Sequence, residues 1–152
     1  MSEQGNLNFS LAEVNLVLHA TEDGGKVLQA IQDVLWIPSE RFSSSPSEGH
    51  YKNRILLLKA ILSSQEAGKL ASRIISLLNS TDREQLSSLL HEYSDEKGNL
   101  YIRLDKQRMC QGRVSLSETD AIRIRFRPAK RYNKPSKSVE RYRGLFQSNF
   151  SI

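Results

Sequence analysis

The amino-acid sequence predicts a single α+β domain, a two-layer sandwich whose mostly antiparallel sheet of four to five strands carries about three helices on one face. Three observations predict this class. Segments of alternating apolar residues, typical of half-buried strands, occur early, midway and near residue 120. Segments with apolar residues three and four apart, typical of amphipathic helices, lie between them. The length of 152 residues suits one domain, and the chain has no internal repeat.

The first strand is predicted over residues 12–20, where apolar residues recur at every second position from Val14 to Ala20. An acidic turn follows, in which Thr21 or Asp23 can cap a helix. Apolar residues at helical spacing then predict that helix, and Pro38 is expected to stop it.

The next two segments differ in composition. Residues 39–49 are rich in serine and contain Pro46 and Gly49, so they predict a mobile loop. Residues 53–62 are almost continuously apolar, which predicts a strand in the middle of the sheet that is partly covered on both faces.

Two capping boxes predict two further helices. Ser63 precedes Glu66 by three residues, and Thr81 precedes Glu84 by the same spacing, so that side chain and backbone can satisfy each other's free donors. Each box is followed by apolar residues at helical spacing, and both helices are expected to pack on the core.

The last strands follow a turn at residues 95–98. Residues 100–105 alternate and predict a third strand, after which Gly112 interrupts the chain. Val114 and Leu116 are candidates to extend the sheet. Residues 121–127, AIRIRFR, alternate most regularly of all, and Pro128 ends that strand.

The net charge of +5 is concentrated near the C-terminus. Residues 1–127 hold 16 basic and 16 acidic residues, whereas residues 128–152 hold six basic residues, Lys130 and Arg131 among them, and one acidic residue. We therefore expect a flexible segment at 1–10, a domain at 11–127 and a basic tail at 128–152 that is disordered or partly helical. Such a tail suits an anionic polymer, although it could serve only solubility.

Composition also excludes several classes of protein. The sequence has neither a secretory signal nor an apolar stretch long enough to span a membrane, so we expect a cytoplasmic protein without membrane contact. A single cysteine, Cys110, excludes an internal disulfide and a multi-cysteine zinc site, and it is most simply a packing residue. No cofactor is expected.

The arginines of the last strand are the first candidate RNA contacts. Arg123, Arg125 and Arg127 project from one face at intervals of about 6.6 to 6.8 Å, which makes a rigid cationic row. Guanidinium groups bind phosphate in a forked geometry and stack on bases, so the row favours RNA over a small anion. The alternative is that these arginines pair with acids on a neighbouring strand.

The third strand adds further candidates. Arg103, Lys106 and Arg108 surround its end, and the outward Tyr101 could stack an unpaired base or simply cover aliphatic groups. The same sheet face would carry a mixture of apolar and polar residues, which favours a second copy, the tail or another subunit as its cover. Its members are Val17, Ile55, Leu57, Ile61 and Tyr101 with Asn15, Lys59 and Arg103.

Few residues of the sequence could support a catalytic role. His19, His50 and Asp105 could meet as the site of a metal-dependent hydrolase. The sequence has no zinc-protease, nucleophile-elbow or P-loop motif, so no enzyme is expected. Glu22 and Asp23 would repel a phosphate from the first helix, and capping explains them without a ligand.

Four groups of residues form an ordered set of motifs: His19, Ala20, Thr21, Glu22 and Asp23; then Gly49, His50, Asn53 and Ile55; then Arg103, Leu104, Asp105, Lys106, Gln107 and Gly112; and finally Asp120. Together they resemble the archaeal predicted RNA-binding, exosome-subunit-like family. The resemblance implies a fold like that of the large-subunit ribosomal protein that binds five-S RNA, and a role in RNA processing near the exosome. The chain departs from the family pattern at Lys52 and Arg54, which add cations beside His50 and are further candidate RNA contacts.

The sequence thus predicts a non-catalytic RNA-binding protein, with exosome components and a second copy of the chain as further possible partners. The leading alternative is a dimeric interaction subunit that uses the sheet face, and the other is the hydrolase.

Overall fold

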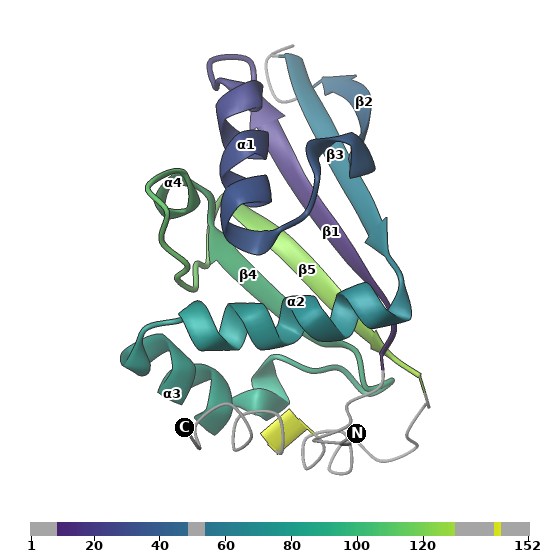
Figure 1. Ribbon diagram of the computed structural model, residues 1–152, viewed down its shortest axis with the longest axis vertical. Coiled ribbons are helices and arrows are strands. Elements are labelled where there is room, and N and C mark those ends of the chain that lie inside the picture. Colours follow the sequence, from purple (N-terminus) through teal and green to yellow (C-terminus); the bar gives the residue numbers. More distant parts are fainter. Residues whose placement is uncertain (1–8, 49–53, 130–141, 144–152) are drawn as a thin grey trace.

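A computed structural model describes residues 9–48, 54–129 and 142–143 (Figure 1). Five strands, four α-helices and two short 3-10 helices occupy these ranges. In chain order they are β1 Phe9–His19, α1 Gly24–Leu35, η1 Ser39–Arg41, β2 Ser43–Glu48, β3 Arg54–Leu62, α2 Ser64–Leu77, α3 Ser80–Ser88, η3 Leu90–Glu92, β4 Leu100–Asp105, α4 Lys106–Cys110 and β5 Ala121–Pro128.

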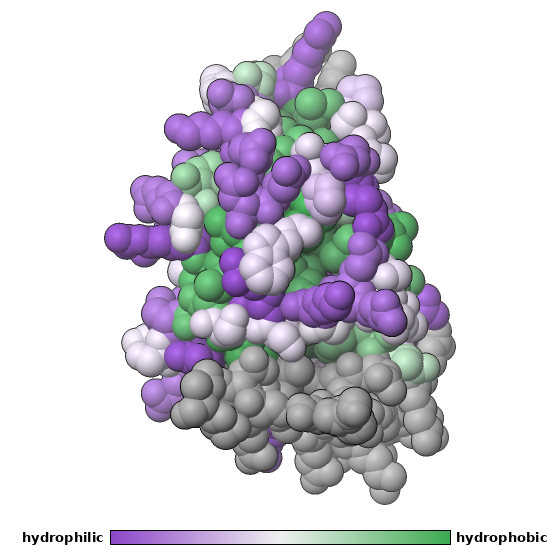
Figure 2. Space-filling view, viewed as in Figure 1, coloured by the Kyte–Doolittle hydropathy of each residue, from purple (hydrophilic) through white to green (hydrophobic). Residues whose placement is uncertain are grey.

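The strands form one sheet in the order β2-β3-β1-β5-β4, and every neighbouring pair is antiparallel. The helices lie in a second layer on one face of this sheet (Figure 1). In the same view, hydrophilic side chains gather over α1 on the outer surface of the helix layer (Figure 2). The predicted α+β two-layer class is confirmed.

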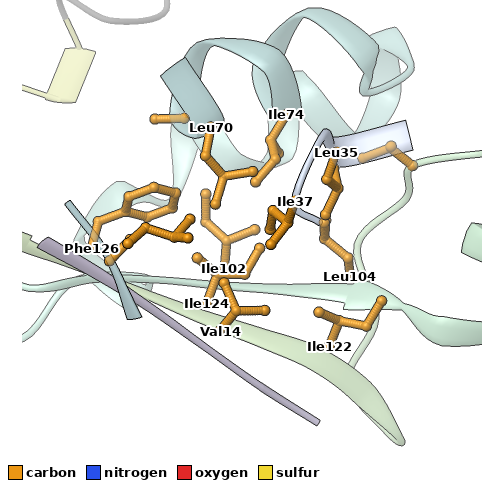
Figure 3. Close-up of a cluster of buried hydrophobic side chains, with 14 of the residues drawn as sticks. Val14, Leu35, Ile37, Leu70, Ile74, Ile102, Leu104, Ile122, Ile124 and Phe126 are labelled. Atoms are coloured by element: carbon orange, nitrogen blue, oxygen red, sulfur yellow. The ribbon is translucent and has the colours of Figure 1, made fainter. Parts of the chain in front are cut away.

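The core fills the space between the two layers (Figure 3). Inward residues of β5 are buried there and alternate with outward arginines, as the sequence predicts. Side chains from α2 and from the segment after α1 meet them from the helix layer. Among the buried residues drawn are Val14, Leu35, Ile37, Leu70, Ile74, Ile102, Leu104, Ile122, Ile124 and Phe126.

The helix boundaries follow local hydrogen bonds. The side chain of Asp23 accepts from the backbone of Lys26 and caps α1, and the predicted capping box of Ser63 and Glu66 begins α2. Helix α1 ends before Pro38, because Trp36 adopts a left-handed conformation with φ of 62°.

The predicted capping box at Thr81 and Glu84 is wrong. Asn79 caps α3, because its side chain accepts from the backbone nitrogen of Asp82 at 2.8 Å and the helix begins two residues earlier. The helix also ends at Ser88, before the short η3 helix.

The predicted mobile loop at 39–49 is wrong over most of its length, since η1 and the edge strand β2 occupy it. Backbone pairing with β3 orders β2 even though its own side chains are small and polar. As a result β3 lies between β2 and β1, and β1 takes the centre of the sheet. Leu57 and Ile61 on β3 are exposed, so the predicted covering of both faces is wrong for the described part of the chain.

The predicted basic tail is partly integrated into the domain. Tyr142 is buried against Phe9, with ring centroids 6.2 Å apart, and its hydroxyl donates to the carbonyl of Gly98. Phe9 is itself buried and begins β1, so ordered structure starts inside the segment predicted to be flexible. Residues 130–141 and 144–152, including Lys130 and Arg131, lie outside the described residues.

Two smaller features complete the fold. Helix α4 was not predicted as a helix; Asp105 caps it by accepting from the backbone of Arg108 at 2.9 Å. Cys110 packs against the core from α4, as predicted. No helix in the described ranges is long and apolar enough to cross a membrane.

Candidate nucleic-acid interface

The face of the sheet opposite the helices carries the outward side chains of all five strands, and we call it the open face. Residues paired across antiparallel strands point to the same side, so the register assigns its members. They are Ser43, Ser45 and Ser47 on β2; Ile55, Leu57, Lys59 and Ile61 on β3; Leu11, Glu13, Asn15, Val17 and His19 on β1; Ala121, Arg123, Arg125 and Arg127 on β5; and Tyr101, Arg103 and Asp105 on β4.

The open face places two arginines side by side. Arg103 on β4 is paired directly with Arg123 on β5, and both side chains are exposed. Neither these two nor Arg127 forms an ion pair with any residue that the structure describes. Like charges directly opposite each other repel, so an anion that bridges them would relieve the repulsion.

The alternative of pairing with a neighbouring acid holds for one arginine of the row. Arg125 donates from Nη2 to Oε1 of Glu13 at 2.5 Å, across the β1–β5 pair. The other oxygen of the same carboxylate lies 3.6 Å from Nζ of Lys59 on β3. One acid is therefore shared between two cations. Among the outward strand residues the open face has two carboxylates, Glu13 and Asp105, of which Asp105 caps α4. The five cations are Lys59, Arg103, Arg123, Arg125 and Arg127.

Tyr101 presents an aromatic ring at the edge of this cationic area. The side chain is 39% exposed and its register partner is Arg125. Its hydroxyl donates to Oδ2 of Asp95 at 2.9 Å, which fixes the ring. Partial burial and the bond to Asp95 raise the pKa of Tyr101, so the hydroxyl keeps its proton at neutral pH.

Asp95 is the partner that sequence reasoning missed. Partial burial alone would raise the pKa of this carboxyl, but hydrogen bonds from Asn99, Tyr101 and the backbone of Lys97 outweigh it and hold the pKa below its usual value. The acidic residues of the turn at 95–98 were the signal that could have indicated this partner, but they predicted only a turn.

A pocket of about 500 Å³ is hollowed into the open face. It lies over the central strands, between the apolar side chains of β3 and the cations of β4 and β5. Its lining includes Asn15, Val17, Leu57, Tyr101, Arg103, Arg123 and Arg125.

Lys106 is not part of this surface, and its predicted contact with RNA is wrong. The residue is 1% exposed, and Nζ donates to the carbonyl of Val17 at 2.7 Å. The same ammonium contacts Glu22 Oε1 at 2.8 Å and Asp120 Oδ1 at 2.9 Å. Lys106 instead joins β1, the turn before α1 and the residue before β5 through these three contacts. Because the ammonium is buried, an RNA phosphate cannot reach it.

The family-motif residues at this sheet end therefore have a structural role. Glu22 also accepts from the backbone of His19 at 2.9 Å, and Nε2 of His19 lies 3.4 Å from Oδ1 of Asp120. Partial burial would raise the pKa of Asp120, but Lys106 and then His19 outweigh it and lower that pKa.

This cluster has the residue types of a metal site, since single donor atoms of His19, Glu22 and Asp120 lie within 4.8 Å of one another. The ammonium of Lys106 already supplies the positive charge between the two carboxylates. Of the three residues weighed as a hydrolase site, His19 belongs to this cluster, Asp105 caps α4, and His50 lies outside the described residues.

The remaining predicted residues that the structure describes lie apart from the open face. Arg54 is exposed on β3 but points to the helix side, because its neighbour Ile55 faces outward. Arg108 and Gln107 are exposed on α4, and Thr21 is exposed in the turn before α1. Gly49, His50, Lys52 and Asn53 lie outside the described ranges.

Comparisons with known proteins identify a family and two archaeal relatives. The model of a family described as RNA binding matches residues 12–127. An RNA-binding protein of Pyrococcus abyssi is 34% identical over 131 residues, which cover 81% of this chain and 84% of that protein. An uncharacterized protein of Methanocaldococcus jannaschii is 30% identical over 118 residues, covering 72% of this chain and 77% of that protein.

Solved structures give the same fold. A DUF54 protein from Methanothermobacter thermautotrophicus has a TM-score of 0.76 and 25% identity, and the match covers 91% of this chain and 98% of that one. A DUF54-family protein from Archaeglobus fulgidus also has a TM-score of 0.76, with 33% identity and coverage of 90% and 99%.

Proposed function

The chain belongs to the RNA binding family, with archaeal relatives, and from this premise we propose that it binds RNA on the open face without catalysing a reaction. One observation carries the choice of surface. Arg103 and Arg123 lie side by side on neighbouring strands, and Arg127 extends the positive charge along β5. Within the described residues, no carboxylate pairs with any of the three.

The charge balance of the open face supports a polyanion as the ligand. Five cations stand against two carboxylates there, Glu13 and Asp105, and each cation placed near a phosphate releases condensed counterions. Guanidinium groups also bind phosphate oxygens two at a time, which a lysine cannot do. Tyr101 adds a ring on which a base can stack.

The basic segment after β5 is proposed to add to the same surface. It leaves the sheet directly after Arg127, an outward residue of the open face, and Pro128. Lys130 and Arg131 follow the end of β5 within three residues. Their charges would increase affinity for any RNA sequence, because phosphate contacts carry no base information.

The test is a salt titration with labelled RNA. Each phosphate contact to single-stranded RNA contributes about −0.7 to the slope of log affinity against log salt. Replacing Arg103, Arg123 and Arg127 together by glutamine should weaken binding and flatten this slope by about 2. The control is Lys26→Gln, an exposed cation on α1 in the opposite layer. An unchanged slope in the triple variant would reject the open face as the binding surface.

A dimeric interaction subunit is the second candidate, and the exposed Leu57 and Ile61 on β3 favour it. Light scattering of the protein without RNA tests it, since a stable dimer predicts twice the monomer mass at micromolar concentration. Cross-linking of bound RNA in cells, followed by sequencing, would identify the natural RNA. An accessory role beside exosome components, a cytoplasmic location and kinship with the five-S RNA-binding ribosomal fold belong to the same proposal.

A further inference from the structure

The open face is organised into rows that run across the strands. One row is polar on every strand, and we call it the polar row; it consists of Ser43, Lys59, Asn15, Arg123 and Arg103. With strands about 4.8 Å apart, the row extends about 19 Å from β2 to β4. It supplies hydrogen-bond donors on all five strands and cations on three of them.

The rows on either side of the polar row carry apolar side chains among polar ones. On one side Leu57 is paired with Val17, and on the other Ile61 and Tyr101 stand at the two ends of the row that holds the Glu13–Arg125 ion pair. Side chains on one strand face repeat every second residue, so each of these rows lies about 6.6 to 6.8 Å from the polar row.

From this layout we infer that the ligand of the open face is unpaired RNA that crosses the strands, with its phosphates on the polar row and its bases against the flanking apolar side chains. The inference rests on the proposed function and names the class of RNA and its path.

A duplex does not fit this layout as well. Paired RNA presents phosphates and sugars outward and keeps its bases stacked inside, so Leu57, Val17 and the ring of Tyr101 would face charged groups. An unpaired strand exposes the faces of its bases, which aromatic and apolar side chains can cover while arginines hold the backbone. A second copy of the chain fits less well, because a twofold contact would bring two cationic halves close together.

The two rows that flank the polar row predict two kinds of base contact. Tyr101 is the register partner of Arg125 and stands two residues before Arg103 on β4. Its hydroxyl donates to Asp95, so its ring is held in place for stacking. Leu57 is 40% exposed beside Val17 and Lys59 and offers an aliphatic surface to a second base.

Fluorescence anisotropy with the full chain tests the class of RNA. The probes are a labelled oligoribonucleotide of about 12 nucleotides, without self-complementarity, and the same strand annealed to its complement. We expect the single strand to bind at least about tenfold more tightly. Equal or tighter binding of the duplex would overturn the inference while leaving RNA binding intact, and no binding of either probe would reject the proposed function itself.

Variants test the base contacts. Tyr101→Ala should lower single-strand affinity about tenfold and leave duplex affinity unchanged, whereas Tyr101→Phe should keep most of it. Leu57→Asn should also weaken single-strand binding, and its control is Leu77→Asn, an equally exposed leucine on α2. A loss that is the same for both probes would overturn base stacking, and circular dichroism of each variant confirms that the fold is kept.

A final comparison tests the path across the strands. Lys59 lies on the polar row but on β3, whereas Arg127 lies on β5 and off the row. A strand that crosses the sheet predicts a larger loss of single-strand affinity for Lys59→Ala than for Arg127→Ala. The reverse order would show that the RNA follows β5 and would overturn the proposed path.

Discussion

Arg103 and Arg123 are direct register partners on β4 and β5, two exposed guanidinium groups that face the same side of the sheet. Without ligand this pair costs stability, since like charges directly opposite each other are destabilising. The same proximity concentrates positive charge where an RNA phosphate can bridge the two groups. Stability and affinity should therefore respond in opposite directions when one of the two arginines is removed.

Arg103→Gln should stabilise the free protein by about 0.5 kcal/mol and weaken RNA binding. Urea unfolding gives the first quantity and anisotropy with labelled RNA gives the second. Arg108→Gln, on α4 away from the open face, is the matched control and should change neither. A destabilised Arg103→Gln protein would contradict the repulsion between Arg103 and Arg123.

Lys106→Met should destabilise the fold by about 3 kcal/mol, because it leaves Glu22 and Asp120 close together without their shared cation. The triple variant that also carries Glu22→Gln and Asp120→Asn should regain part of this loss. Chemical unfolding at neutral pH measures both. Equal stability of wild type and Lys106→Met would show that the buried ion pairs contribute little.

Tyr142→Ala should cost about 3 kcal/mol, since it removes a buried ring from Phe9, and Tyr142→Phe about 1 kcal/mol through the lost bond to Gly98. Deleting residues 128–152 would therefore confuse lost folding with lost charge. Lys130→Gln with Arg131→Gln keeps Tyr142 and should lower RNA affinity alone. Thermal unfolding and salt titration of the three variants separate the two effects.

Glu66 should control part of the acid unfolding of the protein. Its hydrogen bonds with Arg41, and then with Ser63, lower its pKa from 4.5 to about 2. The folded state therefore holds the proton more weakly than the unfolded state, so the contribution is complete above pH 4.5 and is lost as the pH falls towards 2.

Glu66→Gln should remove this pH dependence. In that variant the free energy of unfolding at neutral pH should lie closer to its value at low pH than it does in the wild type. Both side chains of the Arg41–Glu66 pair are more than a third exposed, so salt should reduce the effect. Denaturant midpoints measured between pH 2 and 6 check this, with Glu84→Gln on α3 as the control. If Glu66→Gln loses stability at low pH as steeply as the wild type does, other carboxylates cause the acid unfolding.

Periodicity in the sequence was enough to predict the elements whose side chains fill the core. The alternation of Ile122, Ile124 and Phe126 with arginines predicted β5 and its outward charges correctly, because burial of one face selects that pattern. The edge strand β2 was missed, since Ser43 to Ser47 bury little and are ordered by backbone pairing with β3, which leaves no apolar pattern.

The candidate site was predictable to the extent that it depends on strand alternation. The outward position of Tyr101 and of the arginines followed from their spacing, whereas the pairing of Arg103 with Arg123 depends on strand order. The burial of Lys106 could not be predicted, because its partners Glu22 and Asp120 are 84 and 14 residues away along the chain. A lysine in the basic segment 103–108 indicates positive charge, but the segment does not show whether the side chain is buried.

The left-handed turn at Trp36 has a practical consequence. Trp36 is the single tryptophan of the chain, it is 65% exposed on the helix layer, and the guanidinium of Arg73 lies 3.6 Å above its ring. Its emission spectrum should therefore change when α1 separates from α2 during denaturation. The spectrum should not change when a ligand binds to the opposite side of the sheet. Trp36 is therefore an intrinsic fluorescence probe of the helix layer, which is opposite the proposed binding surface.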